Sequence, residues 1–568
     1  MANSRPQTGG IMILGIDVGG THTDAVLIEG FKIRKKAKIP TDAAHLINSL
    51  LRVATEILTG EDPKKLQRVV LSTTLSTNAI VQDKVERVGM VVAGGPGLSP
   101  ALLPRLPHIF HITGYVNHRG VIAADIDQEE IKAVGEKLRR EGIKHLGVVG
   151  KFSTRNPAQE LRTAALLSDN FRHVSLGHRM SGHLNFRRRI DTTYLNSAVW
   201  ESYQRFVNDV LQFVRSQGIE VPIYILKADG GTFDVAKSAD SPVQTILSGP
   251  AASIMGILSM AKCDEDAVAL DIGGTTTDIA VFADGVPLLE NLGVTIEGHK
   301  TLIRGLRTRS IGLGGDSAVS YEEGRLHVGP RREGPAAALG GPCPTVTDAM
   351  IVLKRTAIGD GDLAVASLTP LAKQMGRSVA ATAEIIFTEA CGKIVAAVRS
   401  FIDEINNEPV YTIHEMLAGK IVAPKTLHVM GGPAAAMADA LGEMLAYRPV
   451  IPQHSEVANA VGAALARTTA EITILADTER RLLTIGEEGV QMEIPSRYTA
   501  AQAIAVGAEK LREKALAMGA HPEDLEIEVV ENQEFNMVRD MYMAGKNIRV
   551  KVQLKPGLIS GFTRGQSL

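Results

Sequence analysis

Three kinds of feature are scarce or missing in this 568-residue sequence. It has only three cysteines, Cys263, Cys343 and Cys391, and they show neither CxxC nor zinc-ligand spacing. We therefore expect structural thiols in a reducing compartment. The formal net charge is only −2, from 61 basic and 63 acidic residues. Without an overall charge bias the chain is not expected to bind nucleic acid or an anionic membrane surface.

Long apolar runs are missing as well. The first apolar run, residues 11–16, is too short for a signal-peptide core of roughly 7–15 residues. No segment approaches the roughly 18 apolar residues that a membrane helix needs. We therefore expect a cytoplasmic protein with no membrane-spanning segment.

The length and the pattern of apolar residues indicate several α/β domains. The chain is too long for one hydrophobic core and should form about three or four domains. Strand-like apolar runs alternate with helical stretches such as 45–58 and 128–141, which favours α/β layers. Beyond about residue 470 the runs 481–485 and 490–494, with a helix at 500–518, indicate a small α+β unit.

One motif occurs twice. Residues 17–24 read DVGGTHTD and residues 271–278 read DIGGTTTD, each between two apolar runs. Both are typical of a strand, a tight turn and a second strand, with a glycine pair that tolerates positive φ. Backbone N–H groups and threonine hydroxyls at such a turn can converge on an anion. Two turns of this kind predict a nucleotide phosphate chain held from both sides.

The residue types in the repeated motif suit phosphate and magnesium. The glycine amides and Thr21, Thr23, Thr275 and Thr277 can donate to phosphate oxygens. Asp17 and Asp271, at the strand ends, can bind Mg²⁺ directly or through water, because hard cations prefer oxygen ligands. Asp24 and Asp278 are interpreted either as hairpin caps or as catalytic carboxylates.

A third glycine element, residues 430–433, follows a strand and precedes a helix. It is interpreted either as an ordinary strand-to-helix turn or as a backbone approach to the adenosine of the nucleotide. Elsewhere, the arginines at 187–189 are interpreted as salt-bridged or solvated, with binding of a substrate anion as the alternative. Lys151 and Lys227 close predicted strands, and either could face a cleft.

The three glycine elements, in this order, resemble the fold shared by actin, Hsp70 chaperones and sugar kinases. Further segments resemble the hydantoinase A / 5-oxoprolinase family. They are 72–79 (STTLSTNA), 191–196 (DTTYLN), 228–231 (ADGG), 248–251 (SGPA), 312–317 (GLGGDS), 328–330 (VGP) and 345–349 (TVTDA). The match runs in order from about residue 11 to residue 465.

The resemblance implies duplicated actin-like (ribonuclease H-like) ATPase domains with ATP in the cleft between them. The expected domains are 11–245, with the first phosphate hairpin, 246–468, with the second hairpin and the adenosine loop, and 469–568, the α+β unit. The family couples ATP hydrolysis to the opening of a cyclic amide such as a hydantoin or 5-oxoproline. Phosphorylation of the amide oxygen would create a leaving group, and catalysis would rest on Mg²⁺, hairpin amides and positioning.

The expected site residues follow from the repeated motif and the resemblance. The catalytic residues are Asp17, Asp271, Thr74 and Asn78, of which Asp17 and Asp271 are also the Mg²⁺ ligands. ATP is expected to contact Gly19, Gly20, Thr21, His22, Thr23, Gly273, Gly274, Thr275, Thr276, Thr277, Gly314, Gly315, Gly431 and Gly432. The substrate, a small molecule with a reactive carbonyl, would enter near Thr74 to Asn78 and residues 248–249.

Three departures from the family pattern keep other functions open. Leu71-Ser72 stands where a His-Gly pair is usual, Asp316 stands where glycine is usual, and residues 454–464 resemble the connecting helix of the wider fold. Small residues in that helix would let two helices pass closely. The alternatives are a chaperone-like ATPase, a subunit of an ATP-dependent ketone carboxylase, and a small-molecule kinase. The chain has no hydantoinase B-like region, so we expect an oligomer in which such a subunit can be the partner.

Overall fold

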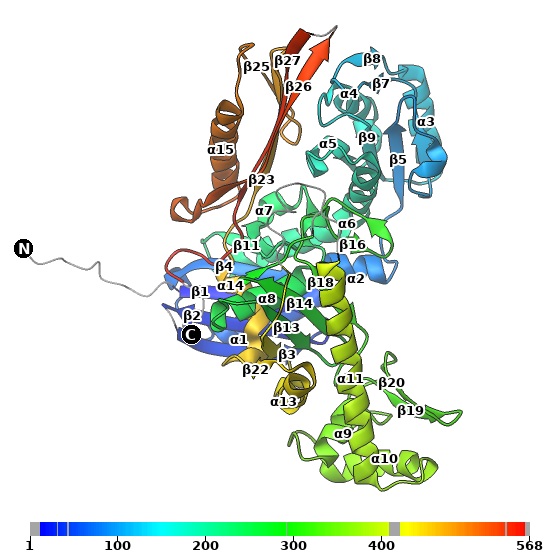
Figure 1. The fold of residues 1–568 in the computed structure, drawn as a ribbon, viewed down its shortest axis with the longest axis vertical. Coiled ribbons are helices and arrows are strands. Elements are labelled where there is room, and N and C mark those ends of the chain that lie inside the picture. Colours follow the sequence, from blue (N-terminus) through cyan, green and yellow to red (C-terminus); the bar gives the residue numbers. More distant parts are fainter. Residues whose placement is uncertain are drawn as a thin grey trace, which may run out of the picture.

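The structure is a computed structural model that describes residues 12–30, 32–42, 45–290, 292–407, 421–539 and 542–562. Within these residues four β-sheets of four or more strands organise an elongated molecule (Figure 1). Two six-stranded sheets occupy its middle. A four-stranded sheet and the C-terminal sheet lie at one end, and helices α9–α11 extend to the other (Figure 1).

The first six-stranded sheet has the strand order β12-β11-β4-β1-β2-β3. Strands β1, β2 and β3 are antiparallel neighbours, whereas β4 is parallel to β1 and β11 is parallel to β4. Every residue of β1 is buried, because helices cover both faces of the sheet. The strands are β1 (Met12–Val18), β2 (His22–Glu29), β3 (Lys32–Pro40), β4 (Leu66–Thr73), β11 (Ile223–Leu226) and β12 (Thr232–Asp234).

The second six-stranded sheet repeats this scheme. Its central strand β13 is antiparallel to β14, β21 is parallel to β13, and β22 is parallel to β21. The outer edge of β14 is shared by β15 and β18. The strands are β13 (Ala267–Ile272), β14 (Thr277–Ala283), β15 (Val286–Pro287), β18 (Thr308–Ile311), β21 (Thr426–Met430) and β22 (Arg448–Val450). The predicted glycine hairpins are therefore β1–β2 and β13–β14, the matching pair at the centre of the two sheets.

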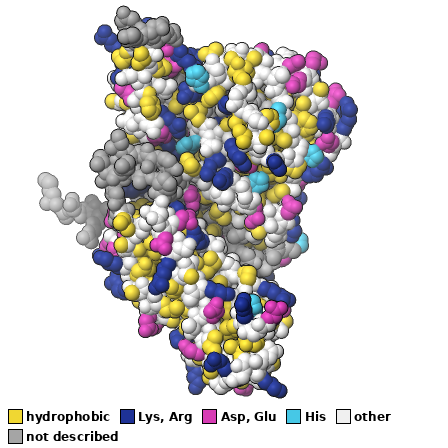
Figure 2. Space-filling model, turned by 45° about the vertical axis from the view of Figure 1, so that its right-hand side comes forward, with side chains coloured by type: hydrophobic (Ala, Val, Ile, Leu, Met, Phe, Trp, Pro, Cys, Tyr) yellow, Lys and Arg dark blue, Asp and Glu magenta, His cyan; other side chains and the backbone are white. Residues whose placement is uncertain are grey.

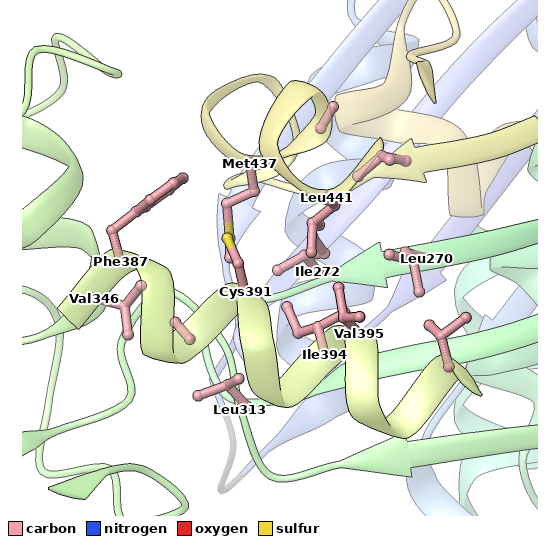
Figure 3. Close-up of a cluster of buried hydrophobic side chains, with 14 of the residues drawn as sticks. Leu270, Ile272, Leu313, Val346, Phe387, Cys391, Ile394, Val395, Met437 and Leu441 are labelled. Atoms are coloured by element: carbon pink, nitrogen blue, oxygen red, sulfur yellow. The ribbon is translucent and has the colours of Figure 1, made fainter. Parts of the chain in front are cut away.

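The core beneath the second sheet is built on one long helix. Helix α11 (Val379–Asn406) packs against the sheet together with α13 (Ala434–Leu445). Phe387, Cys391 and Ile394 project from α11 toward Ile272 of β13 and Met437 of α13 (Figure 3). Cys391 is 1% exposed, as expected of a structural thiol. Helices α9 (Val346–Val352) and α10 (Gly361–Gln374) extend this unit.

Residues 88–176 carry a separate parallel sheet of order β10-β9-β5-β6. Its strands are β5 (Val88–Ala93), β6 (Ile109–His111), β9 (His145–Gly150) and β10 (His173–Leu176). The helices here are α3 (Gln128–Arg140), α4 (Ala158–Leu167), the short α5 (Gly177–Met180) and the long α6 (Phe186–Ser216). Sequence patterns indicated α/β layers in this region but did not separate this sheet from the first one.

Helix α6 was not predicted, and its arginines are used differently from the interpretation above. Arg189 is fully buried, and it donates to the carbonyl oxygens of His183, Gly150 and Lys151 at 2.7–2.8 Å. Arg188 donates to three further carbonyls, among them that of Thr301 at 3.0 Å. The interpretation as salt-bridged or solvated side chains is therefore wrong for these two, because backbone carbonyls take up their N–H groups.

The C-terminal sheet has the order β25-β24-β23-β27-β26 and is covered by α15 (Ala500–Ala517). Its strands are β23 (Glu471–Asp477), β24 (Leu482–Ile485), β25 (Val490–Glu493), β26 (Ile527–Arg539) and β27 (Tyr542–Leu554). The predicted α+β character is confirmed, although β23 was missed. The three domain boundaries remain predictions.

Two short helices pass closely between the six-stranded sheets. They are α8 (Ser248–Met260) and α14 (Ala458–Leu465). A Cβ at Gly462 would overlap the carbonyl oxygen of Ala252, and one at Gly256 would overlap that of Ala458. The small residues of 454–464 therefore have the packing role expected of them.

The surface agrees with the nearly neutral composition. Basic and acidic side chains are interspersed on the face shown in Figure 2. In the described part of the chain, no helix combines the length and apolar character needed to cross a bilayer.

Candidate functional site

The first glycine hairpin connects β1 to β2. Asp17 lies directly opposite Asp24 in the strand pairing, and the turn between the strands is closed by a hydrogen bond from Gly19 N to His22 O of 3.1 Å. The second hairpin has the same construction: Asp271 lies opposite Asp278, and Gly273 N donates to Thr276 O at 2.9 Å. The sequence repeat is thus also a repeat of register and of turn closure.

The glycines of the two turns serve a purpose other than the one predicted. None of Gly19, Gly20, Gly273 and Gly274 has φ in the left-handed region. The expectation of positive φ is therefore wrong, and at Gly19 and Gly274 the glycine instead provides space for neighbouring atoms. A Cβ at Gly19 would lie 3.0 Å from His22 O, and one at Gly274 would lie 2.6 Å from Asp316 Oδ2. At Gly20 a Cβ would meet nothing within 4 Å.

The four aspartates of the hairpins form one electrostatic cluster. Burial, together with the nearby carboxylates of Asp24 and Asp271, raises the pKa of Asp17 to about 7. Burial likewise raises the pKa of Asp271, and with the Asp271 charge it raises that of Asp278 to about 6. Because like charges in a dry site repel, the cluster is poised to accept a cation or protons.

Asn459 of helix α14 joins the two hairpins, and sequence patterns did not single it out. Hydrogen bonding by Asn459 opposes the pKa rise of both Asp17 and Asp271. Ser253 of α8 donates to Asp271 Oδ2 at 2.6 Å and lies 3.0 Å from Asn459 Oδ1. The available signal was a polar residue within each of two apolar, small-residue helices: Asn459 alone in α14, and Ser253 as one of three serines in α8. The two closely packed helices thus carry the polar link between the acidic strand ends.

The threonines of the turns divide into two groups. Thr23 and Thr277 are fully buried, and their hydroxyls bond inside the protein, to Thr41 Oγ1 at 2.9 Å and to Leu313 O at 2.7 Å. Thr21 is exposed, and Thr275 and Thr276 are half-buried. Of the threonines expected to contact phosphate, Thr21, Thr275 and Thr276 have accessible hydroxyls. Thr23 and Thr277 instead hold the strands together.

Asp24 has a partner that supports the hairpin-cap interpretation. Lys38 of β3 binds both of its carboxylate oxygens, at 2.8 and 2.9 Å. Burial raises the pKa of Asp24, and the Lys38 charge opposes the rise. Asp24 is thus paired with Lys38 at the edge of the cluster and is not a free general base.

Thr74 and Asn78 are brought beside the first hairpin by α2 (Leu75–Val81). Thr74 donates to the carbonyl of Val18 at 3.3 Å from both its amide and its hydroxyl. Asn78 Nδ2 donates to Thr74 Oγ1 at 3.1 Å. The start of α8 is attached to the same place, because Ser248 Oγ donates to Thr73 O at 2.9 Å. The residues expected near the substrate therefore meet at the end of β4.

Segment 312–317 supports the second turn. Gly315 N donates to Gly273 O at 2.9 Å, and Asp316 N donates to Gly274 O at 2.7 Å. Asp316, the departure from the family pattern, accepts from Arg332 Nη2 at 3.0 Å. Burial lowers the pKa of His22 in the first turn, and the charges of Asp316 and Arg332 also act on it. The two turns are therefore close enough for charges beside the second turn to act on the pKa of a side chain in the first turn.

The third glycine element also packs on the second hairpin. Gly431 has φ of +95°, and a Cβ there would overlap Ile272 O and lie 2.9 Å from Asp271 Oδ1. Gly432 has open space within 4 Å of its Cβ position. Gly431 is thus required by the backbone, and Gly432 is the member of the pair with room for a ligand.

The cluster fits a magnesium–nucleotide complex better than a bare metal ion. Asp17 Oδ1 is buried and has no hydrogen-bond partner among the described residues. Hard carboxylate oxygens of this kind suit Mg²⁺. However, the described residues contain no group of three or more acidic, histidine or cysteine ligands arranged for a metal. Mg²⁺ commonly needs only one or two protein carboxylates when phosphates supply other ligands.

Comparison with known proteins identifies the family. The model of the hydantoinase/oxoprolinase N-terminal region matches residues 13–171, and that of hydantoinase/oxoprolinase matches residues 189–472. The chain belongs to the hydantoinase/oxoprolinase family. The resemblance drawn from the sequence motifs is thus confirmed.

Two relatives of this hydantoinase/oxoprolinase family member illustrate the range of similarity. It is 25% identical to the acetophenone carboxylase gamma subunit of Aromatoleum aromaticum over 389 residues, which is 60% of this chain and 53% of that protein. It is 26% identical to caprolactamase subunit alpha of Pseudomonas jessenii over 388 residues, 61% of this chain and 55% of that protein. The chain therefore spans little more than half the length of these relatives.

Two solved structures share the fold of this family member. Nucleotide-free acetone carboxylase matches with a TM-score of 0.72 and 16% identity, over 97% of this chain and 88% of that one. The ATP-dependent caprolactamase from Pseudomonas jessenii matches with a TM-score of 0.70 and 19% identity, over 95% of this chain and 87% of that one. The predicted mixed α/β architecture is confirmed.

Proposed function

We propose that this chain is the ATP-dependent component of a hydrolase that activates a cyclic amide of the hydantoin, 5-oxoproline or lactam type. The observation that carries the proposal is the pair of register-matched hairpins whose buried Asp17 and half-buried Asp271 meet around Asn459. Membership of the hydantoinase/oxoprolinase family supports the choice of reaction.

The nucleotide would lie between the two hairpins. The two six-stranded sheets share one strand scheme and present their glycine turns toward a common cluster, which supports duplicated actin-like domains with ATP in the cleft between them. Turn amides, with the hydroxyls of Thr21, Thr275 and Thr276, would hold the phosphates. Asp17 and Asp271 would bind Mg²⁺, and the backbone at Gly432 would face the adenosine.

The proposed reaction requires little covalent chemistry from the residues of the chain. ATP supplies a transferable phosphoryl group, which converts the oxygen of an amide carbonyl into a leaving group. The residues of the chain orient the phosphate and the carbonyl and neutralise the developing charge. Thr74 and Asn78, next to the first turn, would position the carbonyl, with residues 248–249 beside them at the end of β4.

Relatives favour one second candidate. The acetophenone carboxylase gamma subunit and the acetone carboxylase beta subunit of Xanthobacter autotrophicus are subunits of ketone carboxylases. The same site could then activate the enol oxygen of a ketone. Under either reading we expect a partner subunit, of the hydantoinase B type for the cyclic amide, to complete the reaction.

A coupled assay tests the proposal. The purified chain, with and without its co-purified partner, is given Mg·ATP and a panel of hydantoin, 5-oxoproline, caprolactam, acetone and acetophenone. We expect phosphate release that depends on a cyclic amide, with the ring-opened product detected by mass spectrometry. Asp271→Asn should abolish it, since the carboxylate is needed to hold Mg²⁺, whereas Asp403→Asn, at an exposed position near the C-terminal end of α11, should leave it unchanged.

Two outcomes would contradict the cyclic-amide reading. Phosphate release that depends on ketones and bicarbonate would establish the carboxylase candidate instead. Phosphate release that responds to no small molecule would remove both candidates.

A further inference from the structure

A second cavity lies outside the hairpin site. It has a volume of about 90 Å³ and opens where α5 and α6, the end of β11, residues 302–304 and the C-terminal sheet meet. None of the hairpin residues lines it. The segment before α8 separates the two sites, because Val243 lines the cavity while Ser248 is bonded beside the first hairpin.

Arg304 is the unusual residue of this cavity. Its side chain is 14% exposed, and its terminal nitrogens Nη1 and Nη2 make no hydrogen bond within the described residues. Nη1 lies 3.6 Å from Asp229 Oδ2 and 3.9 Å from Glu471 Oε2, which are ion-pair distances too long for hydrogen bonds. Buried N–H groups without partners are costly, so a ligand that satisfied them would bind favourably.

The carboxylates near Arg304 already have other partners. Asp229 accepts from Gly231 N at 3.0 Å and from Thr469 Oγ1 at 2.8 Å. Glu471 is paired with Lys551 at 2.9 Å. Although burial opposes it, the charges of Lys227 and Arg304 hold the pKa of Asp229 below its usual range. These groups fix the charge around Arg304 but leave its planar N–H fork, which suits bidentate binding of a carboxylate, unused.

Glu487 provides the complementary group. Both of its carboxylate oxygens are buried and make no hydrogen bond within the described residues. It is pressed against Gly182, where a Cβ would lie 2.6 Å from its Cδ. Burial raises the pKa of Glu487, and the Lys514 charge opposes the rise. A buried carboxylate without a hydrogen-bond donor suits a ligand that carries a positively charged N–H group.

The remaining wall is mixed: apolar side chains lie beside the polar Ser181, Thr192 and Gln244 and the basic Arg179, Lys227 and Lys514. Met180, Val243, Leu302, Ile303 and Met518 line the cavity together with Arg304 and Glu487. The apolar side chains accept a few methylene groups of a ligand. We propose that this cavity binds a short aliphatic amino acid as a zwitterion, its carboxylate on Arg304 and its ammonium group on Glu487. The proposal does not depend on the reaction at the hairpin site.

Calorimetric titration of the full chain without nucleotide tests the proposal. The probes are glycine, 4-aminobutyrate and 6-aminohexanoate, which differ in the spacing of the two charges, and the matched ligands butyrate and butylamine. We expect saturable binding of at least one amino acid at one site per chain, and binding of butyrate and butylamine at least about tenfold weaker. Absence of binding for all three spacings would overturn the proposal.

Variants assign the two ends of the ligand. Glu487→Gln, nearly the same shape, should weaken binding of the amino acid about tenfold or more and leave that of butyrate unchanged. Arg304→Gln should weaken both, whereas Arg309→Gln, whose arginine pairs with Glu404 outside the cavity, should change neither. If Arg304→Gln does not fold, Glu487→Gln decides. Equal amino-acid binding by wild type and Glu487→Gln would overturn the assignment.

Discussion

At the scale of single residues, the site is defined by carboxylates placed where their charge is unfavourable. Asp17 is 5% exposed, and one of its oxygens has no hydrogen-bond partner within the described residues. The protein tolerates this cost because folding places the aspartates at the ends of two buried strands, where a cation can neutralise them. We therefore predict that the negative charge on Asp17 lowers the free energy of unfolding when no ligand is bound.

The first prediction concerns Asp17→Asn and pH. Burial raises the pKa of Asp17 to about 7, so between about pH 4 and pH 7 the folded protein holds a proton that the unfolded chain releases. The charge therefore lowers stability progressively as pH rises through this window, and the loss is complete above pH 7. Without nucleotide, Asp17→Asn should be more stable than wild type at pH 8, by on the order of 3 kcal/mol, and similar at pH 4.

Urea unfolding of both proteins across this pH range is the measurement. A variant that is less stable than wild type at pH 8 would show that Asp17 is a satisfied structural carboxylate, and the account of the cluster would then be wrong.

Asn459 gives the second prediction at this scale. Because hydrogen bonding by Asn459 lowers the pKa of both Asp17 and Asp271, Asn459→Ala should raise both. Binding of Mg·ATP, which needs the ionised carboxylates, should then weaken at a higher pH than in wild type, with the acid limb displaced by up to about one unit. Titration of Mg·ATP binding against pH measures this. The exposed Asn536→Ala serves as control, and an unmoved acid limb would exclude the bridging role.

At the scale of elements, the sequence predicted the helices whose apolar residues recur regularly on one face, with polar residues on the other. Helices α1 (Leu46–Leu58), α3 and α15 were predicted to within one residue at each end because each has a regular apolar pattern and a glycine two residues beyond its end. Helix α6 was missed because Thr192, Thr193, Asn196 and Ser197 are buried, which hides its apolar stripe. Polar residues in a core are invisible to pattern arguments.

The candidate site was predictable in part for a related reason. Residue type and repetition placed the two hairpins, the third glycine loop and Asp17 with Asp271. They could not reveal that Asn459 lies between the hairpins, since this depends on the crossing of α8 and α14 from distant parts of the chain. They also assigned positive φ to turn glycines that in fact serve close approach.

That helix crossing gives the third prediction. A Cβ at Gly462 would overlap Ala252 O and lie 2.9 Å from the carbonyl carbon of Met255, both backbone atoms that cannot move independently. Gly462→Ala should therefore lower the free energy of unfolding by about 1–3 kcal/mol. It should also weaken Mg·ATP binding, because Asn459 and Ser253 shift with their helices. Urea unfolding and nucleotide titration measure both effects.

Gly392→Ala is the matched control for Gly462→Ala. It lies within α11 with open space around its Cβ position, so alanine there should be neutral or stabilising by up to about 1 kcal/mol. Equal effects of the two substitutions would mean that close helix approach is not what Gly462 provides.

At the scale of the whole molecule, two sheets of the same strand scheme each contribute one turn to a single cluster, and two packed helices connect them. A hinge or a closing motion would act through this connection. The second cavity lies on the far side of the segment before α8, at the junction with the C-terminal sheet. None of the hairpin residues proposed to bind the nucleotide lines this cavity.

The central claim is that the two hairpins form one Mg·ATP site. Its most direct test is a crystal structure of the full chain with Mg²⁺ and a non-hydrolysable ATP analogue. The account predicts one nucleotide, with its phosphates between the turns at residues 19–21 and 273–276, Mg²⁺ beside Asp17 and Asp271, and the base near Gly432. A nucleotide held by one hairpin alone, or bound elsewhere in the molecule, would contradict it.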